Sequence, residues 1–264
     1  MSFVLRRTEE LSVEALRQRL ADDPRQAARL ILEAASQGEV EAQALLGQIL
    51  LDGTGIERDP ALAATWFGIA AQNGHLMARN MLGRCHEHGW GVPADPAEAA
   101  QHYAMAAAED LDWGLYNLAN LLSTGRGVPQ DVAHAYALYH RAADLGHAKS
   151  MNLVGRYYEE GVAVTRDLQQ AHLWYERSAR AGDFRGQFSH AAVLADRGEV
   201  EQAREWLLDA LAGGNLNFLR VAREQLEQAP QPEVRALALA YYRRAAELGE
   251  TDDGDRYAAA LQRL

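Results

Sequence analysis

Cysteine and lysine are nearly absent from this chain of 264 residues, and proline is scarce. Cys85 is the one cysteine and Lys149 the one lysine. A single cysteine cannot form an intramolecular disulfide, which agrees with a reducing compartment. The chain is nevertheless 48% apolar and long enough to bury a core, so we expect an ordinary globular protein.

An excess of basic charge and long apolar runs are also missing. The formal net charge of −11 offers no basic footprint for a phosphate backbone, which argues against DNA or RNA as a partner. Only three consecutive apolar residues precede Arg6, whereas a secretory signal needs about 7–15. No segment approaches the roughly 18 apolar residues of a membrane span. The sequence therefore predicts a cytoplasmic protein that binds neither nucleic acid nor membrane.

The chain repeats itself every 36 residues. An aspartate recurs at this interval and opens a segment with apolar residues at helical spacing: Asp23, Asp59, Asp95, Asp131 and Asp167. We expect each to be an N-cap, because its carboxylate can accept the free N–H groups of the first helical turn. Proline follows three of them, where a helix tolerates a missing N–H: Pro24, Pro60 and Pro96.

The predicted helices end as regularly as they begin. A left-handed C-cap is expected at Gly38, Gly74, Gly146 and Gly182, with Asp110 as the exception. The same helices carry an alanine and an aromatic residue at fixed positions: Ala63 and Phe67, Ala99 and Tyr103, Ala135 and Tyr139, Ala171 and Tyr175. The preceding helices carry a small residue: Gly47, Gly83, Ala119, Gly155 and Ala191. Small residues let two helices pack closely as a hairpin, and the ring fills the gap beside them.

Glycine-rich connections join the two helices of each hairpin. They read GTGI, GWGV, GRGV and GVAV and start at Gly53, Gly89, Gly125 and Gly161. Together these residues resemble the Sel-one-like repeat (SLR) family, a relative of the tetratricopeptide repeat, whose pattern is A-x-x-x-L-G-x-x-Y-x-x-G-x-G-V-x-x-D-x-x-x-A-x-x-W-Y-x-x-A-A-x-x-G. The resemblance implies an all-α fold, a right-handed superhelical solenoid of antiparallel helix hairpins. Each hairpin in such a fold buries its apolar face against its neighbours.

We predict one solenoid domain, residues 1–264, built from unequal units. The expected bounds are 9–37 for a degenerate N-terminal hairpin, 38–181 for four SLR units of 36 residues, 182–213 for a tetratricopeptide-like unit, 214–248 for a divergent unit and 249–264 for a C-terminal capping helix. The tetratricopeptide-like unit is four residues shorter than the others and lacks the G-x-G-V connection. The divergent unit has QAPQPE as its connection instead.

The stretch CHEHGWGVPADP, residues 85–96, raises the question of a metal site. In the repeat frame Cys85 and His86 fall on core positions, and only His88 falls on a variable position that we expect to be exposed. A zinc site needs three or four converging ligands, which this spacing does not provide. The sequence also contains no G-x-S-x-G elbow and no G-x-x-x-x-G-K-[ST] loop. We therefore expect no metal, no cofactor and no catalytic site.

Recognition is then expected at positions that vary between repeats. In tetratricopeptide-like hairpins the first helix lines the concave face, and its exposed positions lie six and three residues before the small residue and one and four after it. In this acidic chain these positions gather basic, amide and aromatic side chains, which suits a polypeptide partner. The candidate partner-binding residues are Asn80, Arg84, Trp113, Tyr116, Asn120, Lys149, Asn152, Arg156, Arg185 and Phe188.

These observations predict a non-catalytic adaptor or scaffold. Its concave groove would hold a partner protein, such as an enzyme, or a peptide. Two alternatives stay open. A few small cysteine-rich SLR proteins are linked to β-lactam binding or hydrolysis, although they carry paired cysteines in each repeat. Self-assembly is the other alternative, through surface that we expect to be exposed at Tyr241 and Tyr242, although the sequence gives no indication of a homo-oligomer.

Overall fold

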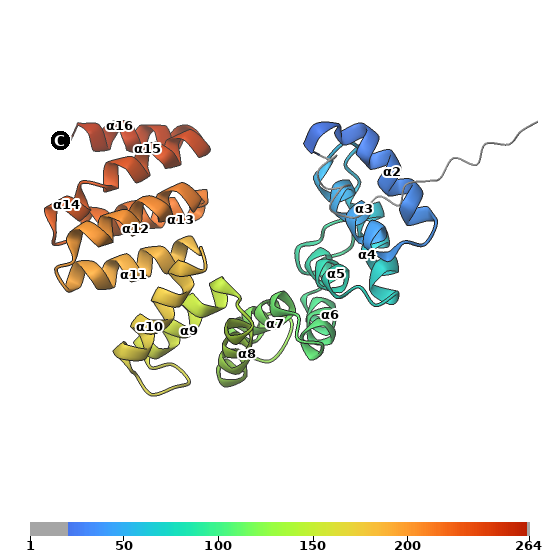
Figure 1. Cartoon of the computed structure of the whole chain (residues 1–264), viewed down its shortest axis with the longest axis horizontal. Coiled ribbons are helices and arrows are strands. Elements are labelled where there is room, and N and C mark those ends of the chain that lie inside the picture. The colour runs from blue at the N-terminus through green and yellow to red at the C-terminus, as the bar shows by residue number, and fades with distance from the viewer. Residues whose placement is uncertain (1–20, 263–264) are drawn as a thin grey trace, which may run out of the picture. The chain divides into compact units, whose positions relative to one another are not determined.

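A computed structural model describes residues 21–262, and all regular secondary structure in this range is helical (Figure 1). The chain forms two compact parts, one ending at Asp131 and one beginning at Val132. The N-terminal part contains α2 (Pro24–Ser36), α3 (Val40–Asp52), α4 (Pro60–Gln72), α5 (Leu76–His88), α6 (Pro96–Ala108) and α7 (Asp112–Thr124). The C-terminal part contains α8 (Val132–Asp144), α9 (Ala148–Glu160), α10 (Leu168–Arg180), α11 (Phe184–Asp196), α12 (Val200–Gly213), α13 (Leu216–Glu227), α14 (Pro232–Arg235), α15 (Ala238–Leu248) and α16 (Thr251–Leu261). Residues 9–20 of the predicted N-terminal hairpin lie outside the described range.

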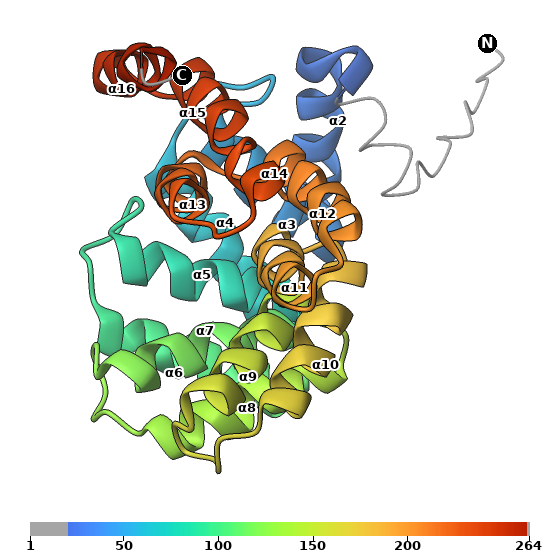
Figure 2. The ribbon, with the colours of Figure 1, turned by 90° about the vertical axis from the view of Figure 1, so that its left-hand side faces the viewer.

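The helices pair in sequence order. α3 packs against α4, α5 against α6, α9 against α10, and α11 against α12. We call the odd-numbered members of the series α3 to α11 first helices and the even-numbered members of α4 to α12 second helices. The second helices α4, α6, α8 and α10 also pack on the next first helix, as α4 does on α5 and α10 on α11 (Figure 2). The predicted all-α solenoid of helix hairpins is therefore confirmed.

Side-chain caps define the starts of the helices. The carboxylates of four of the predicted N-caps, Asp23, Asp59, Asp95 and Asp167, accept a backbone N–H three residues further on at 3.0–3.1 Å. The first helices use different caps, which the sequence did not reveal. Nδ1 of His75 accepts the N–H of Ala78 at 3.0 Å, and Nδ1 of His147 accepts that of Ser150 at 3.3 Å. The predicted left-handed residues at helix ends are confirmed, from φ 59° at Asp110 to 100° at Gly146.

The pairing of a small residue with a ring fixes how closely two helices of a hairpin approach. A Cβ added to Gly47 would lie 2.7 Å from the ring of Phe67, and one added to Gly155 would lie 2.6 Å from the ring of Tyr175. These rings are at most 2% exposed, so they fill the space that the missing side chain leaves. The predicted packing of small residue against ring is thus confirmed in both parts of the chain.

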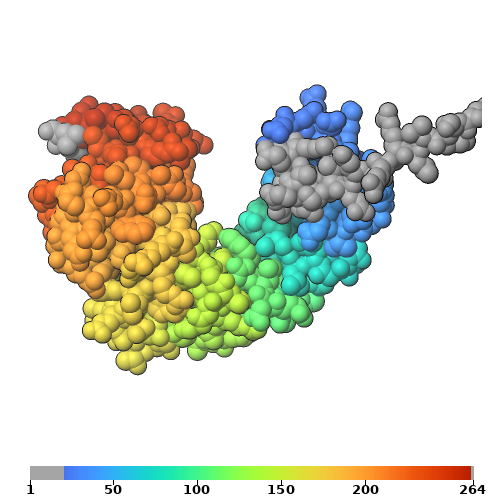
Figure 3. Space-filling view, in the orientation of Figure 1, coloured from blue at the N-terminus to red at the C-terminus, as the bar shows by residue number. Residues whose placement is uncertain are grey.

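Helix α15 packs against both α13 and α16. The side chain of Asp253 on α16 is fully buried and pairs with Arg223 at 2.9 Å and with Arg220 at 2.6 Å, both on α13. Residues Tyr241 and Tyr242 are 0% and 5% exposed, so the expectation that they form an exposed self-association surface is wrong. The hydroxyl of Tyr241 donates to the carbonyl of Leu207 at 2.6 Å, and the Tyr242 ring lies 4.7 Å from the guanidinium of Arg223. On the face that Figure 3 turns to the viewer, the side chains of the C-terminal helices lie packed side by side.

Candidate functional site

The cysteine and histidines of residues 85–96 do not converge. Cys85 is fully buried, and burial raises the pKa of its thiol to about 11. His86 is half-buried and stacks on His102 with ring centroids 5.4 Å apart, while His88 is exposed and lies against Trp90. Among residues 21–262, no group of three or more His, Cys, Asp or Glu side chains is arranged to hold a metal ion. The interpretation of Cys85 as a core residue is confirmed.

Two of the candidate partner-binding residues are not exposed, and this corrects the sequence-based assignment. Asn80 is 2% exposed and Asn152 is 4% exposed. The amide of Asn117 donates to Oδ1 of Asn80 at 2.8 Å, and the hydroxyl of Ser189 donates to Oδ1 of Asn152 at 3.1 Å. The position three residues before the small residue therefore faces the neighbouring first helix, where an amide satisfies a buried polar partner.

The other candidate residues of the N-terminal part are half-buried. Arg84 on α5 places its guanidinium 5.0 Å from the Trp90 ring, a cation–π contact. On α7, Trp113 and Tyr116 meet edge to face with ring centroids 6.0 Å apart, and Asn120 follows one turn later. The structure thus places a guanidinium and an aromatic pair on successive first helices, α5 and α7.

The candidate residues of the C-terminal part differ in exposure. Arg156 and Arg185 are exposed, and Lys149 is half-buried. Arg156 forms an ion pair with Glu160 at 3.0 Å, and the Arg185 guanidinium lies 4.5 Å from the Phe184 ring. The remaining candidate is Phe188, which packs into the apolar cluster of α11 to α15. Its ring lies 5.6 Å from that of Phe218 and 6.4 Å from that of Tyr241, so only part of its area is open to a partner.

Two acidic residues on the first helices hold the buried tyrosines of the repeats. The hydroxyl of Tyr103 donates to Glu87 at 2.6 Å, and that of Tyr175 donates to Glu159 at 2.5 Å. Burial, together with these carboxylates, raises the pKa of both tyrosines well above the ordinary value. Glu87 also forms an ion pair with Arg126.

A cavity of about 580 Å³ lies beside α11 in the C-terminal part. Its walls come from the starts and ends of several helices, and they include Glu159, Leu168, His172, Tyr175, Val193 and Gln231. Nε2 of Gln231 donates to the carbonyl of Ala195 at 2.8 Å, which joins the α13–α14 connection to the end of α11. Sequence analysis did not identify Leu168, His172 or Gln231. The sequence feature that could have indicated this cavity is the missing G-x-G-V connection in residues 182–213. Residues that such a connection covers in other repeats are left exposed where it is absent.

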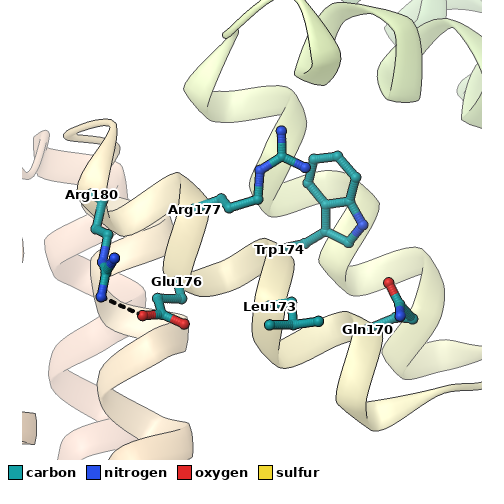
Figure 4. Close-up of a pocket in the computed structure, with 6 residues that line it drawn as sticks. All are labelled: Gln170, Leu173, Trp174, Glu176, Arg177 and Arg180. Carbon is teal, nitrogen blue, oxygen red and sulfur yellow. Dashed lines mark ion pairs between the residues drawn. The ribbon is translucent and has the colours of Figure 1, made fainter.

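A second cavity, of about 290 Å³, lies along one face of α10 (Figure 4). Its lining residues all belong to that helix. The Arg177 guanidinium lies 3.9 Å from the Trp174 ring, and Arg180 pairs with Glu176 at 2.6 Å. These groups satisfy one another along the helix, so they do not converge on a common point as a binding site requires.

The Sel1 repeat pattern matches residues 18–39, 40–75, 76–111, 114–147, 148–183 and 220–250. The chain belongs to the Sel1 repeat family. The matched ranges leave out 184–219, where the G-x-G-V connection is missing. Proteins of Sel1 repeats generally act as protein-interaction scaffolds and are generally non-catalytic. Comparison with the curated proteins gave no significant match.

Several solved structures share this Sel1 repeat architecture. A Sel1 repeat protein from Oxalobacter formigenes has a TM-score of 0.74 and 24% identity, and the alignment covers 88% of this chain and 99% of that one. A protective antigen of uropathogenic Escherichia coli strains with an SLR fold has a TM-score of 0.65 and 26% identity, covering 95% of this chain and 56% of the antigen. In residues 21–262 of the present chain, no helix has both the length and the apolar character that a membrane span requires.

Proposed function

We propose that this Sel1 repeat protein is a non-catalytic adaptor that binds a partner protein through its first helices. Each part of the chain has its own set of candidate residues on its first helices, and we call each set a first-helix face. The set is Arg84, Trp113, Tyr116 and Asn120 in the N-terminal part and Lys149, Arg156 and Arg185 in the C-terminal part. The observation that carries the proposal is that four of these seven residues are basic in a chain whose net charge is −11. A guanidinium group can donate two parallel hydrogen bonds to a carboxylate and can also donate to a backbone carbonyl, so these residues suit a protein partner.

Local contacts hold these groups in place before a partner arrives. Arg84 lies over the Trp90 ring and Arg185 over the Phe184 ring, while Trp113 and Tyr116 contact each other. A side chain that is already ordered loses less conformational entropy when it binds. Aromatic and arginine side chains of this kind supply most of the energy at protein interfaces.

The single thiol of the chain is unsuited to act as a catalytic nucleophile, which agrees with a non-catalytic role. Cys85 is the one thiol of the chain, and burial raises its pKa to about 11. The reactive thiolate is therefore a small fraction at neutral pH, and solvent does not reach the sulfur. Self-assembly is not carried further, because Tyr241 and Tyr242 are buried.

Charge reversal on the first-helix face of the C-terminal part tests the adaptor proposal. The variant Arg156→Glu/Arg185→Glu removes one ion pair within a helix and one arginine–ring contact. Its matched control is Arg180→Glu/Arg177→Glu on the second helix α10, which also removes one such ion pair and one such contact. Capture from a lysate of the source organism, quantified by mass spectrometry, should lose a stoichiometric partner with the first variant and retain it with the control. Equal retention or equal loss in the two variants would refute binding on the first-helix face.

A further inference from the structure

The connection between the helices of a complete Sel1 repeat folds back onto the start of the preceding second helix. A Cβ added to the second glycine of the connection would collide with the backbone at that start: Gly55 against Pro24, Gly91 against Pro60, and Gly127 against Pro96. The branched apolar residue that follows this glycine is half-buried against the core: Ile56, Val92 and Val128. Each connection thus covers one helix start and inserts one branched side chain.

The site that Val128 fills is formed by residues of α6 and α7. These residues are Ala99, Ala100, Tyr103 and, on α7, Leu121. Two repeats later the same positions hold Ala171, His172, Tyr175 and Val193. These residues line or adjoin the 580 Å³ cavity. The connection that would cover them is short here, because only Arg197–Glu199 join α11 to α12. This short connection reaches the site only through Arg197, whose guanidinium donates to Nδ1 of His172 at 2.9 Å. Leu168, which corresponds to Pro96, is 43% exposed.

The chain replaces one function of the missing connection but not the others. In other repeats a side chain of the connection donates to a carbonyl at the end of the first helix, as Arg58 does to Leu51 at 2.9 Å and Gln130 to Ser123 at 2.8 Å. At the corresponding carbonyl of Ala195 the donor is Gln231, from the α13–α14 connection. The hydrogen bond is therefore restored, while the apolar site beside His172 stays open as a cavity.

The charge at the rim of the cavity is also left without its usual partner. In the complete repeat, Glu87 accepts from the Tyr103 hydroxyl and pairs with Arg126 of the following GRGV connection. Two repeats later, Glu159 accepts from the Tyr175 hydroxyl in the same way. The shorter α11–α12 connection directs its arginine, Arg197, to His172 instead, and among the described residues no arginine forms an ion pair with the Glu159 carboxylate. The space that Val128 fills in the earlier repeat is thus open. Arg166, which lines the cavity, donates to the backbone carbonyl of Glu159 at 2.9 Å and forms no ion pair with its carboxylate.

We propose that the 580 Å³ cavity beside α11 binds a Gly-Arg-Gly-Val-type turn of a partner protein, in place of the connection that this repeat lacks. The arginine would pair with Glu159, and the valine would fill the space lined by His172, Tyr175 and Val193. Glycine flanks the arginine because the backbone of such a turn must approach the start of α10 as closely as Gly127 approaches Pro96. This inference rests on the proposed adaptor function in that the occupant belongs to a protein, and it adds a specific recognition element.

A peptide identical to residues 123–131, STGRGVPQD with both ends blocked, is the probe for this site. Titrated into the ¹⁵N-labelled full chain, it should give saturable shifts at Leu168, His172 and Val193. Changing its arginine to glutamine or its valine to serine should weaken binding about ten-fold each, because each change removes a charge-assisted hydrogen bond or a buried apolar side chain.

Variants of the protein separate this site from unspecific binding. Glu159→Gln should weaken binding about ten-fold, and the arginine-to-glutamine peptide should then bind no worse than the original peptide to that variant. Glu160→Gln, the matched control, removes the adjacent carboxylate and should leave the affinity unchanged. Replacing Arg197–Glu199 by residues 125–131 restores the missing connection in the chain itself, and it should abolish peptide binding while circular dichroism shows an intact fold.

The outcomes distinguish this inference from the adaptor proposal. No saturable shift at millimolar peptide, or equal binding by the variant with the restored connection, overturns the cavity as a recognition site. If that result accompanies loss of the lysate partner in Arg156→Glu/Arg185→Glu alone, the adaptor proposal stands. Peptide binding that requires Glu159, together with capture that is indifferent to Arg156→Glu/Arg185→Glu, supports the cavity and overturns the first-helix face.

Discussion

Replacing Gly83 by alanine is expected to destabilise the N-terminal part of the protein. A Cβ at this position would lie 2.7 Å and 2.9 Å from two ring carbons of Tyr103 and 3.2 Å from Cβ of His102. The ring cannot easily move away, because Tyr103 is fully buried and its hydroxyl is held by Glu87 at 2.6 Å. Either the two helices separate, or this hydrogen bond is strained.

Two opposing effects set the size of the change. Alanine is favoured over glycine inside a helix by about 1 kcal/mol. Overpacking a close-packed site costs about 1–3 kcal/mol, and strain on a hydrogen bond to a charged group adds to this. We therefore expect Gly83→Ala to lower the free energy of unfolding by about 1–2 kcal/mol. Gly68 on α4 is the matched control, since its added Cβ would meet only Leu82 at 3.9 Å. Gly68→Ala should gain up to about 1 kcal/mol.

Urea unfolding followed by circular dichroism measures the two changes, and hydrogen exchange assigns them to particular helices, because a repeat protein can open one region at a time. A Tyr103→Ala background provides the decisive comparison. With the ring removed, Gly83→Ala should become neutral or stabilising. Changes of the same sign at Gly83 and Gly68, or a Gly83→Ala penalty that persists without the ring, would refute the packing argument.

Two further predictions concern buried polar pairs. Asp253→Asn should destabilise the α13–α16 region by about 3 kcal/mol in hydrogen-exchange measurements, because the buried guanidinium of Arg223 loses its counter-charge. Hydrogen bonds from Arg220 and Arg223 hold the pKa of Asp253 below its ordinary value of 3.8. The stabilisation by the Asp253 carboxylate is therefore present above that pH and is lost as the pH falls through the native pKa. An acid titration in which wild type and variant lose stability in parallel would contradict this. Asn80→Ala should cost about 1–3 kcal/mol in urea unfolding, because the Asn117 amide loses its acceptor. Combining it with Asn117→Ala should cost less than the sum of the two single changes, and strictly additive costs would show that the two amides are not coupled.

The packing within each hairpin could be predicted because both partners recur at fixed positions. Gly83 and Tyr103 belong to neighbouring helices of one repeat, and the same two positions are occupied by Gly47 and Phe67 one repeat earlier. The exposure of Asn80 could not be predicted in this way. At about 100° per residue, Asn80 lies about 40° closer to the small residue Gly83 than Arg84 does. Spacing along one helix does not show how far the next first helix covers the side of α5 that carries Asn80. In the structure Asn117 of α7 covers this side.

The cavity illustrates the same limit. The sequence shows that residues 182–213 lack a G-x-G-V connection, and the structure shows what that connection would have covered. That Gln231 reaches the carbonyl of Ala195 could not be foreseen, because in other repeats the donor comes from the connection that directly follows the helix. An interaction that has moved to another repeat leaves no periodic signal.

The sequence alone determined the fold class, the aspartate caps that recur every 36 residues and the close packing within each hairpin. These features depend on contacts between neighbouring positions or on positions that recur every 36 residues, and both can be read along the chain. Only the tertiary structure decided that Asn80 and Asn152 are buried, that Asp253 pairs with Arg223, and that a cavity remains beside α11. Each of these depends on the relative placement of two helices about one repeat apart, which side-chain packing fixes only when the whole stack has formed.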